Sequence, residues 1–495
     1  MSVRMLFVIA VNLYTSRIVL QNLGIENYGI YNVLGGILIL FSFLNTAMGQ
    51  ATQRFLAYEL GKGETIHLNN IFIMTLNIHV LIAIAIAIAA DIVGSYLIYN
   101  YLSIPIEKLE TAFWVFQLSI IATFFTITQI PFNAMLNAHE NFYVYAVISI
   151  IDALLKLASA ASIIFMTENI RLLYYGLFML LTVIVTTSAY RIYCYRSYKE
   201  THWRLYWNKA MFKQLSSYTS WSLIGNIAGS ASDQGVNIIL NNFCGPTINA
   251  ARGVAMQIKT ALAGFVYNFQ GASIPQIIKL YASQENDAMI RLVIQSSKIS
   301  FFLFFYICLP IWVELPYLLD LWLVEVPKYL TVFSRLILLN VLFQSMSGTL
   351  QTVIQATGEI KGYQLTVGIL QLTVFPLSYM CLYWGFRPET TIIVSCVMSI
   401  FICIALLYIC HKTVHFPIGR YLKEVLMKDV FVFVQGIIIP FLIWRFEEAS
   451  FYRPFMVIIL CLLLNPIIIY FSGFSCSERK LVKQFILYKI KKQAD

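Results

Sequence analysis

Apolar stretches long enough to cross a membrane recur along the whole chain, separated by short polar segments or by breaks that contain Gly or Pro. A membrane-spanning helix needs about 20 predominantly apolar residues, and on this basis the pattern predicts about fourteen spans. They cover residues 3–21, 29–48, 71–99, 111–134, 142–166, 171–193, 218–240, 247–271, 292–312, 330–355, 363–384, 390–410, 429–446 and 454–473.

Two spans near the middle of the chain have one polar face each. In the span 218–240 the polar positions recur at offsets of about 4, 7 and 11 residues, which a helix of about 3.6 residues per turn places on one side. These positions are Asn226, Ser230, Asp233 and Asn237. In the span 247–271 the same periodicity aligns Asn249, Arg252, Lys259 and Gln270. The first face is polar with one acid, and the second is cationic.

The charges on these two faces are costly in a bilayer. A charged side chain at the centre of a membrane helix costs about 2.5 to 3.5 kcal/mol on insertion scales. Asp233, Arg252 and Lys259 are therefore expected to line a water-filled cavity or to pair with one another. We expect the function of the chain to depend on this cavity.

Composition supports a membrane protein rather than a soluble domain. Of the 495 residues, 59% are hydrophobic and 12% are charged, and the mean hydropathy is +0.74. The long unbroken apolar runs lack the alternation of a transmembrane barrel, so the spans should be helices. The predicted fold class is all-α and polytopic. The nine cysteines form no CxxC pair, so we expect no metal site and no cofactor.

The distribution of basic residues predicts the orientation in the membrane. The net charge is +10. With the N-terminus inside, about 22 Lys and Arg fall on the cytoplasmic side and about six on the other, as the positive-inside rule requires for an even number of spans. We expect both termini to be cytoplasmic. The N-terminal apolar stretch is interpreted as a retained first span because it lacks a signal-peptide cleavage site.

A basic and aromatic segment, 194–216, divides the chain into halves. We interpret it as an amphipathic linker at the cytoplasmic interface rather than a nucleic-acid site. Residues 18–60 and 238–281 share a pattern of a Gly-containing turn, a long span and a basic exit, which indicates an internal repeat. The predicted domains are an N-lobe (1–193), the linker (194–216), a C-lobe (217–411), a C-terminal helix pair (412–475) and a basic tail (476–495).

Other charges also fall within spans. Asp152 and Lys156 have the i,i+4 spacing of an ion pair, which serves either as a self-neutralising structural pair or as part of a transport cavity. Arg17 lies near the outer end of the first span, where it either extends to the interface or faces the cavity.

Three sequence runs resemble the multidrug/oligosaccharidyl-lipid/polysaccharide (MOP) exporter superfamily: LGIENYGIYNVLGG (Leu23 to Gly36), QATQRFLAYELGKGE (Gln50 to Glu64) and NAARGVAMQIKTAL (Asn249 to Leu262). The likeness extends over essentially the whole chain and is greatest to the polysaccharide-biosynthesis flippases. It implies two pseudo-symmetric six-helix lobes around a cationic cavity that opens alternately to each side, with an additional C-terminal helix pair.

The resemblance also implies a substrate and its ligands. Family members of this branch move undecaprenyl-pyrophosphate-linked oligosaccharides across the bacterial inner membrane for O-antigen or capsule synthesis. Arg17, Arg54 and Arg252 match basic positions of the family and are the expected pyrophosphate ligands. Lys259, Asn226, Asn237 and Asn249 are added as cavity residues from the helix periodicity, and Asp233 as the residue that couples transport to H⁺ or Na⁺.

The sequence leaves several functions open. A flippase for lipid II, the peptidoglycan precursor, needs the same pyrophosphate chemistry. A MATE-type drug/cation antiporter should have an acidic cavity, whereas bases dominate here. A glycan polymerase or ligase needs a large outer loop with catalytic residues, and none of the motifs HExxH, GxSxG or P-loop is present in the sequence. We therefore expect a transporter and not an enzyme, with membrane lipids and other polysaccharide-assembly proteins as partners and no nucleic acid.

Overall fold

The structure is a computed structural model of the whole chain. From Ser42 to Ser475 it describes the backbone of every residue except 64, 101–103, 324–325 and 447–451. At a few further positions in this range it describes the backbone but not the side chain. It also describes scattered residues between 7 and 34, and residues 478–480 and 483. None of the described residues forms a β-strand.

The described chain is a succession of long helices joined by short connections. The helices of its first half are α2 (Ser42–Lys62), α3 (Thr65–Asn100), α4 (Leu109–Ala138), α5 (Phe142–Ser162), α6 (Glu168–Ser197), α7 (Lys209–Cys244) and α8 (Pro246–Ala282). The helices of its second half are α9 (Asn286–Val313), α10 (Leu315–Trp322), α11 (Leu330–Thr357), α12 (Lys361–Tyr383), α13 (Thr390–Val414), α14 (Ile418–Tyr421), α15 (Met427–Phe446) and α16 (Tyr452–Ile468).

Ten helical stretches among the described residues are long and apolar enough to cross a membrane. The expected spans 218–240 and 247–271 are not among these ten, although α7 and α8 contain 36 and 37 residues. At 1.5 Å per residue such helices are about 55 Å long, well beyond the roughly 30 Å of hydrocarbon. Their polar faces lower their hydropathy. About half of the residues in the spans expected at 3–21 and 29–48 lie outside the described residues. The all-α, multi-pass fold predicted from the sequence is confirmed.

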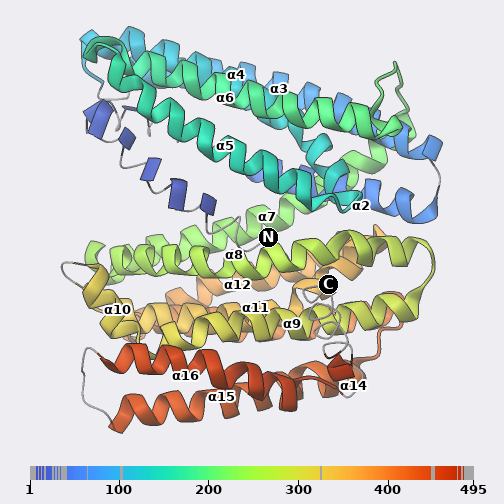
Figure 1. Cartoon of the computed structure of the whole chain (residues 1–495), viewed down its shortest axis with the longest axis vertical. Coiled ribbons are helices and arrows are strands. Elements are labelled where there is room, and N and C mark those ends of the chain that lie inside the picture. Colours follow the sequence, from blue (N-terminus) through green and yellow to red (C-terminus); the bar gives the residue numbers. More distant parts are fainter. Residues whose placement is uncertain are drawn as a thin grey trace, which may run out of the picture. The chain divides into compact units, whose positions relative to one another are not determined.

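The chain packs as two compact units, and α7 and α8 contribute to both. The first unit comprises residues 1–227 and 278–284. In it α4 lies between α3 and α6, and α5 packs along α6 (Figure 1). The last turn of α8 belongs to this unit, where Lys279 Nζ lies 2.7 Å from Glu140 Oε1. The lobe and linker bounds expected from the sequence stay a prediction.

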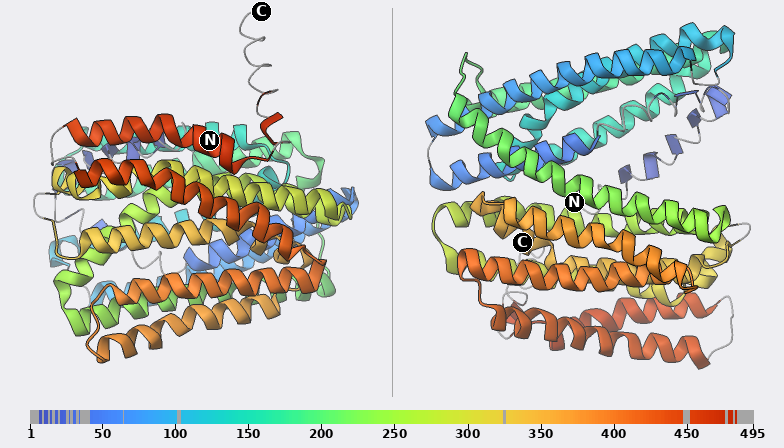
Figure 2. Two further views of the ribbon diagram at one scale, coloured as in Figure 1. Left: turned by 90° about the horizontal axis from the view of Figure 1, so that it is seen from below. Right: turned by 180° about the vertical axis from the view of Figure 1, so that it is seen from behind.

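The second unit comprises residues 228–277 and 285–495. In this unit α11 packs against both α9 and α13, and α12 packs against α13. The C-terminal helices α15 and α16 lie side by side and both contact α9 (Figure 2). A buried cluster that includes Phe301, Phe305, Val432 and Val457 fills this contact. The C-terminal pair is therefore part of the hydrophobic core of the second unit.

The connection between α6 and α7 packs against α3. It contains one turn of 3-10 helix, Lys199–Thr201, and then runs without regular structure to Lys209. Asn69 Nδ2 donates to the Glu200 carbonyl at 2.7 Å, and Asn77 Nδ2 donates to the Tyr206 carbonyl at 3.1 Å. These bonds satisfy backbone groups that the irregular segment leaves without helical partners.

Candidate functional site

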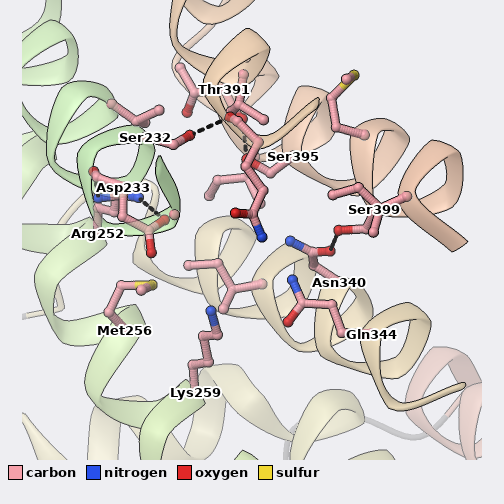
Figure 3. A pocket seen from close by; sticks show the side chains of 18 residues that line it. Ser232, Asp233, Arg252, Met256, Lys259, Asn340, Gln344, Thr391, Ser395 and Ser399 are labelled. Carbon is pink, nitrogen blue, oxygen red and sulfur yellow. Dashed lines mark hydrogen bonds and ion pairs between the residues drawn. The ribbon is translucent and has the colours of Figure 1, made fainter. Parts of the chain in front are cut away.

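A polar pocket lies within the second unit, between the faces of α7 and α8 that the sequence singled out and three further helices. Its cavity is about 130 Å³. The polar residues that line it come from α7, α8, α11, α12 and α13 (Figure 3): Ser232, Asp233, Arg252, Lys259, Asn340, Gln344, Gln371, Thr391, Ser395 and Ser399. Of the residues predicted for the site, the structure brings Asp233, Arg252 and Lys259 together here.

Arg252 is buried and bound to α7. Its guanidinium Nη1 donates to the Asn237 side-chain oxygen and, at 3.4 Å, to the Asp233 carbonyl. Nη2 lies 3.6 Å from Asp233 Oδ1. The Arg252 side chain is 7% exposed, whereas that of Asp233 is 58% exposed. The ion pair therefore has a buried cation and a carboxylate that solvent or a ligand can reach.

Lys259 lies two turns beyond Arg252 on α8, and its ammonium points into the pocket (Figure 3). No hydrogen bond or ion pair joins Lys259 to any residue that the structure describes. Together Arg252, Lys259 and Asp233 give the pocket one excess positive charge at neutral pH. A cation in this position, on a helix long enough to cross a membrane, favours an anionic ligand.

The rest of the pocket lining is apolar or neutral and polar, and the sequence did not single out these neutral polar residues. Ser399 Oγ donates to Asn340 Oδ1 at 2.7 Å, which joins α13 to α11. Ser232 Oγ donates to the Gln371 carbonyl at 2.7 Å, which joins α7 to α12. Their spacing places them on shared helix faces, since Asn340 and Gln344 are four residues apart and Thr391, Ser395 and Ser399 form a row on α13. Spacing of uncharged residues alone does not mark a site.

The size of the pocket limits what it can hold. Binding sites for drug-sized ligands measure about 300 to 1,000 Å³, whereas this cavity measures about 130 Å³. It has room for a hydrated cation or for a single phosphate group. It has no room for an oligosaccharide, so it can be only one subsite for a larger substrate.

Arg54 was also predicted as a pyrophosphate ligand, and the structure places it in the first unit. Its guanidinium carbon is 4.6 Å from the ring centre of Phe55, 4.7 Å from that of Tyr58 and 5.7 Å from that of Tyr218. The side chain is 6% exposed. Arg54 thus lies among aromatic faces, which attract a cation.

The remaining residues predicted for the site either do not line this pocket or lie outside the residues that the structure describes. Asn226 belongs to the first unit and does not line the pocket, and its Nδ2 is buried without a hydrogen-bond partner among the described residues. Arg17 lies outside the described residues, as does the side chain of Asn249 at the start of α8. Their assignment to the site stays a prediction.

Asp152 and Lys156 form the ion pair that their spacing indicated. Lys156 Nζ lies 2.7 Å from Asp152 Oδ2 on α5. Both side chains are about one-third exposed, at 34% and 30%. The pair neutralises itself on one helix, and neither residue lines the pocket of the second unit.

Comparison with solved structures identifies the fold. An outward-facing multidrug resistance MATE family transporter of the MOP superfamily matches with a TM-score of 0.72 and 14% identity, over 84% of this chain and 94% of that one. A MATE transporter in complex with MaD3S matches with a TM-score of 0.71 and 14% identity, over 84% and 95% of the two chains. A MOP superfamily transporter from Pyrococcus furiosus, described as having a binding pocket of reverse polarity that suggests a different function, matches with a TM-score of 0.70 and 14% identity, over 84% and 94%.

No protein-family model matches the chain, and no curated protein matches it. The fold of this chain is similar to that of MOP superfamily transporters, as the resemblance of its sequence implied.

Proposed function

We propose that this protein is a transporter of undecaprenyl-pyrophosphate-linked oligosaccharide, which it moves from the inner to the outer leaflet of a bacterial inner membrane for O-antigen or capsule synthesis. The observation that carries the proposal is the pocket of the second unit, where Arg252 and Lys259 outnumber Asp233 inside helices long enough to cross a bilayer. Both termini would be cytoplasmic, and the protein would catalyse no covalent step.

A pyrophosphate is the ligand class that this charge fits best. It carries two or more negative charges, which must cross about 30 Å of hydrocarbon without their water. Charge-assisted hydrogen bonds from Arg and Lys replace that hydration. The cavity of about 130 Å³ accepts one phosphate group beside Lys259. The glycan would occupy space outside this pocket, and the polyprenyl chain would stay in the lipid.

The ion pair between Arg252 and Asp233 suggests how substrate and ion binding are coupled. An anion that binds Arg252 competes with the Asp233 carboxylate for the guanidinium. Asp233, which is 58% exposed, is then free to take up H⁺ or Na⁺. Transport requires that ligand and ion bind the inward-open and outward-open states with different affinities, and this exchange would supply such a difference.

A MATE-type drug/cation antiporter is the second candidate, because the comparison structures include multidrug MATE transporters. An organic cation would have to bind Asp233 against the repulsion of Arg252 and Lys259. The transporter from Pyrococcus furiosus is described as having reversed pocket polarity and a different function. The charge of the pocket is therefore the property that separates the two candidates.

Equilibrium binding to the purified protein tests the proposal. The probes are undecaprenyl pyrophosphate, undecaprenol as the uncharged control and a quaternary ammonium dye as the drug-like cation. Loss of a charged hydrogen bond costs about 1.5 to 3 kcal/mol. Lys259→Gln should therefore weaken pyrophosphate binding roughly ten- to hundredfold, since about 1.4 kcal/mol is tenfold.

Lys259→Arg is the matched control that keeps the charge, and it should bind nearly as well as the wild type. The proposal fails if undecaprenol binds as tightly as its pyrophosphate. If instead the dye binds and Asp233→Asn abolishes that binding, the antiporter becomes the better account.

A further inference from the structure

A buried lysine joins the end of the chain to α9. Lys298 is fully buried, and its Nζ donates to both carboxylate oxygens of Glu478 at 2.7 Å. Glu478 follows α16 and lies in the segment that leads into the basic tail. A buried ammonium needs a nearby negative charge, and here the C-terminal segment supplies it.

Glu478 is held in place by a capping box. The Ser475 backbone N–H and hydroxyl both donate to Glu478 Oε2, at 2.7 and 2.9 Å, and the Glu478 N–H donates back to Ser475 Oγ at 3.4 Å. This is the S-x-x-E pattern that starts helices. Burial alone would raise the pKa of Glu478, but the bonds from Lys298 and Ser475 outweigh burial and hold the pKa below its ordinary value.

A second carboxyl group lies in the same buried region. Asp429, in the first turn of α15, is 0% exposed. Neither of its carboxyl oxygens has a hydrogen-bond partner among the residues that the structure describes. The charged groups that act on it are Lys298 from α9 and its neighbour Lys428. Tyr421 also faces Asp429, but its hydroxyl donates to the Met346 carbonyl at 2.5 Å.

The buried charges of this cluster do not balance if both acids are ionised, because Lys428 is only partly buried. One buried ammonium, on Lys298, would then face two carboxylates, and Glu478 already takes its hydrogen bonds. An ionised carboxylate without hydrogen bonds is strongly disfavoured in an apolar interior, and such a group takes up a proton instead. A metal cation would bind Asp429 less favourably than a proton does, because the ammonium of Lys298 would repel the metal.

We propose that Asp429 is a proton-binding site, protonated while Lys298 is paired with Glu478, and that release of Glu478 is coupled to release of this proton. When the C-terminal segment dissociates from α9, Asp429 releases its proton to solvent. The Asp429 carboxylate then forms the ion pair with Lys298 in place of Glu478. The cluster keeps one positive and one negative charge in both states. Docking of the C-terminal segment therefore weakens as pH rises and Asp429 ionises.

This site shares no residue with the substrate pocket, and its test does not require a transported substrate. Infrared spectroscopy of the purified full-length protein at neutral pH detects the C=O stretch of a protonated carboxyl group, identified by its shift in D₂O. We expect one such band in the wild type and its loss in Asp429→Asn. Asp320→Asn, which changes an exposed carboxyl of the same unit, should leave the band unchanged.

Glu478→Gln provides the second and independent arm. It removes the partner of Lys298 but keeps the shape of the side chain, so Asp429 should ionise and the band should again disappear. A band that persists in Asp429→Asn belongs to another group and overturns the proposal. A band that Glu478→Gln leaves intact overturns the coupling, and this arm remains decisive if Asp429→Asn does not fold.

Discussion

Arg252 and Lys259 share one face of α8 but have different surroundings. The Arg252 guanidinium is buried against Asn237 and Asp233 of α7. The Lys259 ammonium has no partner among the described residues and points into the cavity. A buried guanidinium that loses its carboxylate becomes an uncompensated charge. Substitutions of Arg252 therefore combine effects on packing and on ligand binding, whereas Lys259 reports on the ligand alone.

His139 is a second residue whose surroundings have a measurable consequence. Its ring stacks on Tyr198 at 4.1 Å between ring centres, and Asn141 Nδ2 donates to the Tyr198 hydroxyl at 3.2 Å. Burial lowers the pKa of His139 below its ordinary value; Glu200 opposes this shift and Lys279 adds to it. The folded first unit therefore favours the neutral ring.

This lowered pKa makes stability depend on pH. Below the unfolded-state pKa of about 6.5 the unfolded chain binds the proton more readily than the folded chain, so stability falls as pH drops below that value. His139→Gln should reduce the loss of melting temperature between roughly pH 7.5 and 5.5. His202→Gln, at an exposed histidine stacked on Tyr195, serves as the control. An unchanged pH dependence in His139→Gln would contradict this interpretation.

At the scale of single residues the sequence identified the charged part of the pocket and missed its neutral part. Asp233, Arg252 and Lys259 stand out because a charge is costly in a membrane helix. Ser395 does not stand out, because its hydroxyl donates to the Thr391 carbonyl one turn earlier at 3.1 Å. A hydroxyl satisfied in this way is inexpensive in an apolar span and gives little sign of function.

At the scale of elements, two buried ion pairs attach the C-terminal part of the chain at α9. Lys298, near the middle of α9, pairs with Glu478, and Glu314, which directly follows α9, pairs with Arg453 of α16. Arg453 Nε and Nη2 donate to the two oxygens of Glu314 at 3.1 and 3.0 Å. Buried ion pairs add little net stability but disfavour alternative packings, which would leave their charges unpaired.

Breaking the pair of Glu314 and Arg453 should therefore be costly, while replacing both residues should not. Arg453→Met removes the hydrogen-bonded partner of Glu314, which is 0% exposed, and should cost about 3 to 5 kcal/mol of unfolding free energy. The double variant Glu314→Met with Arg453→Leu should be close to the wild type. Denaturant unfolding in detergent measures all three proteins. A double variant as unstable as the single one would refute this account.

Helix ends were less predictable than helix existence. The expected span 71–99 lies within α3, which begins earlier, at Thr65. Hydropathy marks only the portion in hydrocarbon. The start of α3 instead depends on contacts outside the hydrocarbon region. There the Asn69 side chain donates a hydrogen bond to the connection between α6 and α7. Contacts between segments more than 130 residues apart leave no local pattern in the sequence.

At the scale of the whole molecule, the fold and the charge of the pocket carry different information. The helical fold matches MOP superfamily transporters at 14% identity, and such a match indicates architecture rather than substrate. Hydropathy suffices to predict an all-α, multi-pass fold, because the bilayer imposes helices on the chain. The substrate depends on a few polar side chains, so the proposed function rests on Arg252, Lys259 and Asp233.

The most direct test of the proposed function is the leaflet location of lipid-linked glycans in the native cell after depletion of this protein. Polyprenyl-pyrophosphate lipids are extracted, identified by mass spectrometry and assayed for exposure on either side of the membrane. We expect a specific lipid-linked oligosaccharide to accumulate on the cytoplasmic leaflet. Wild-type protein and Asp320→Asn should clear it, and Lys259→Gln should not. Absence of any accumulation, or accumulation of unpolymerised intermediate on the outer leaflet, would contradict the flippase assignment.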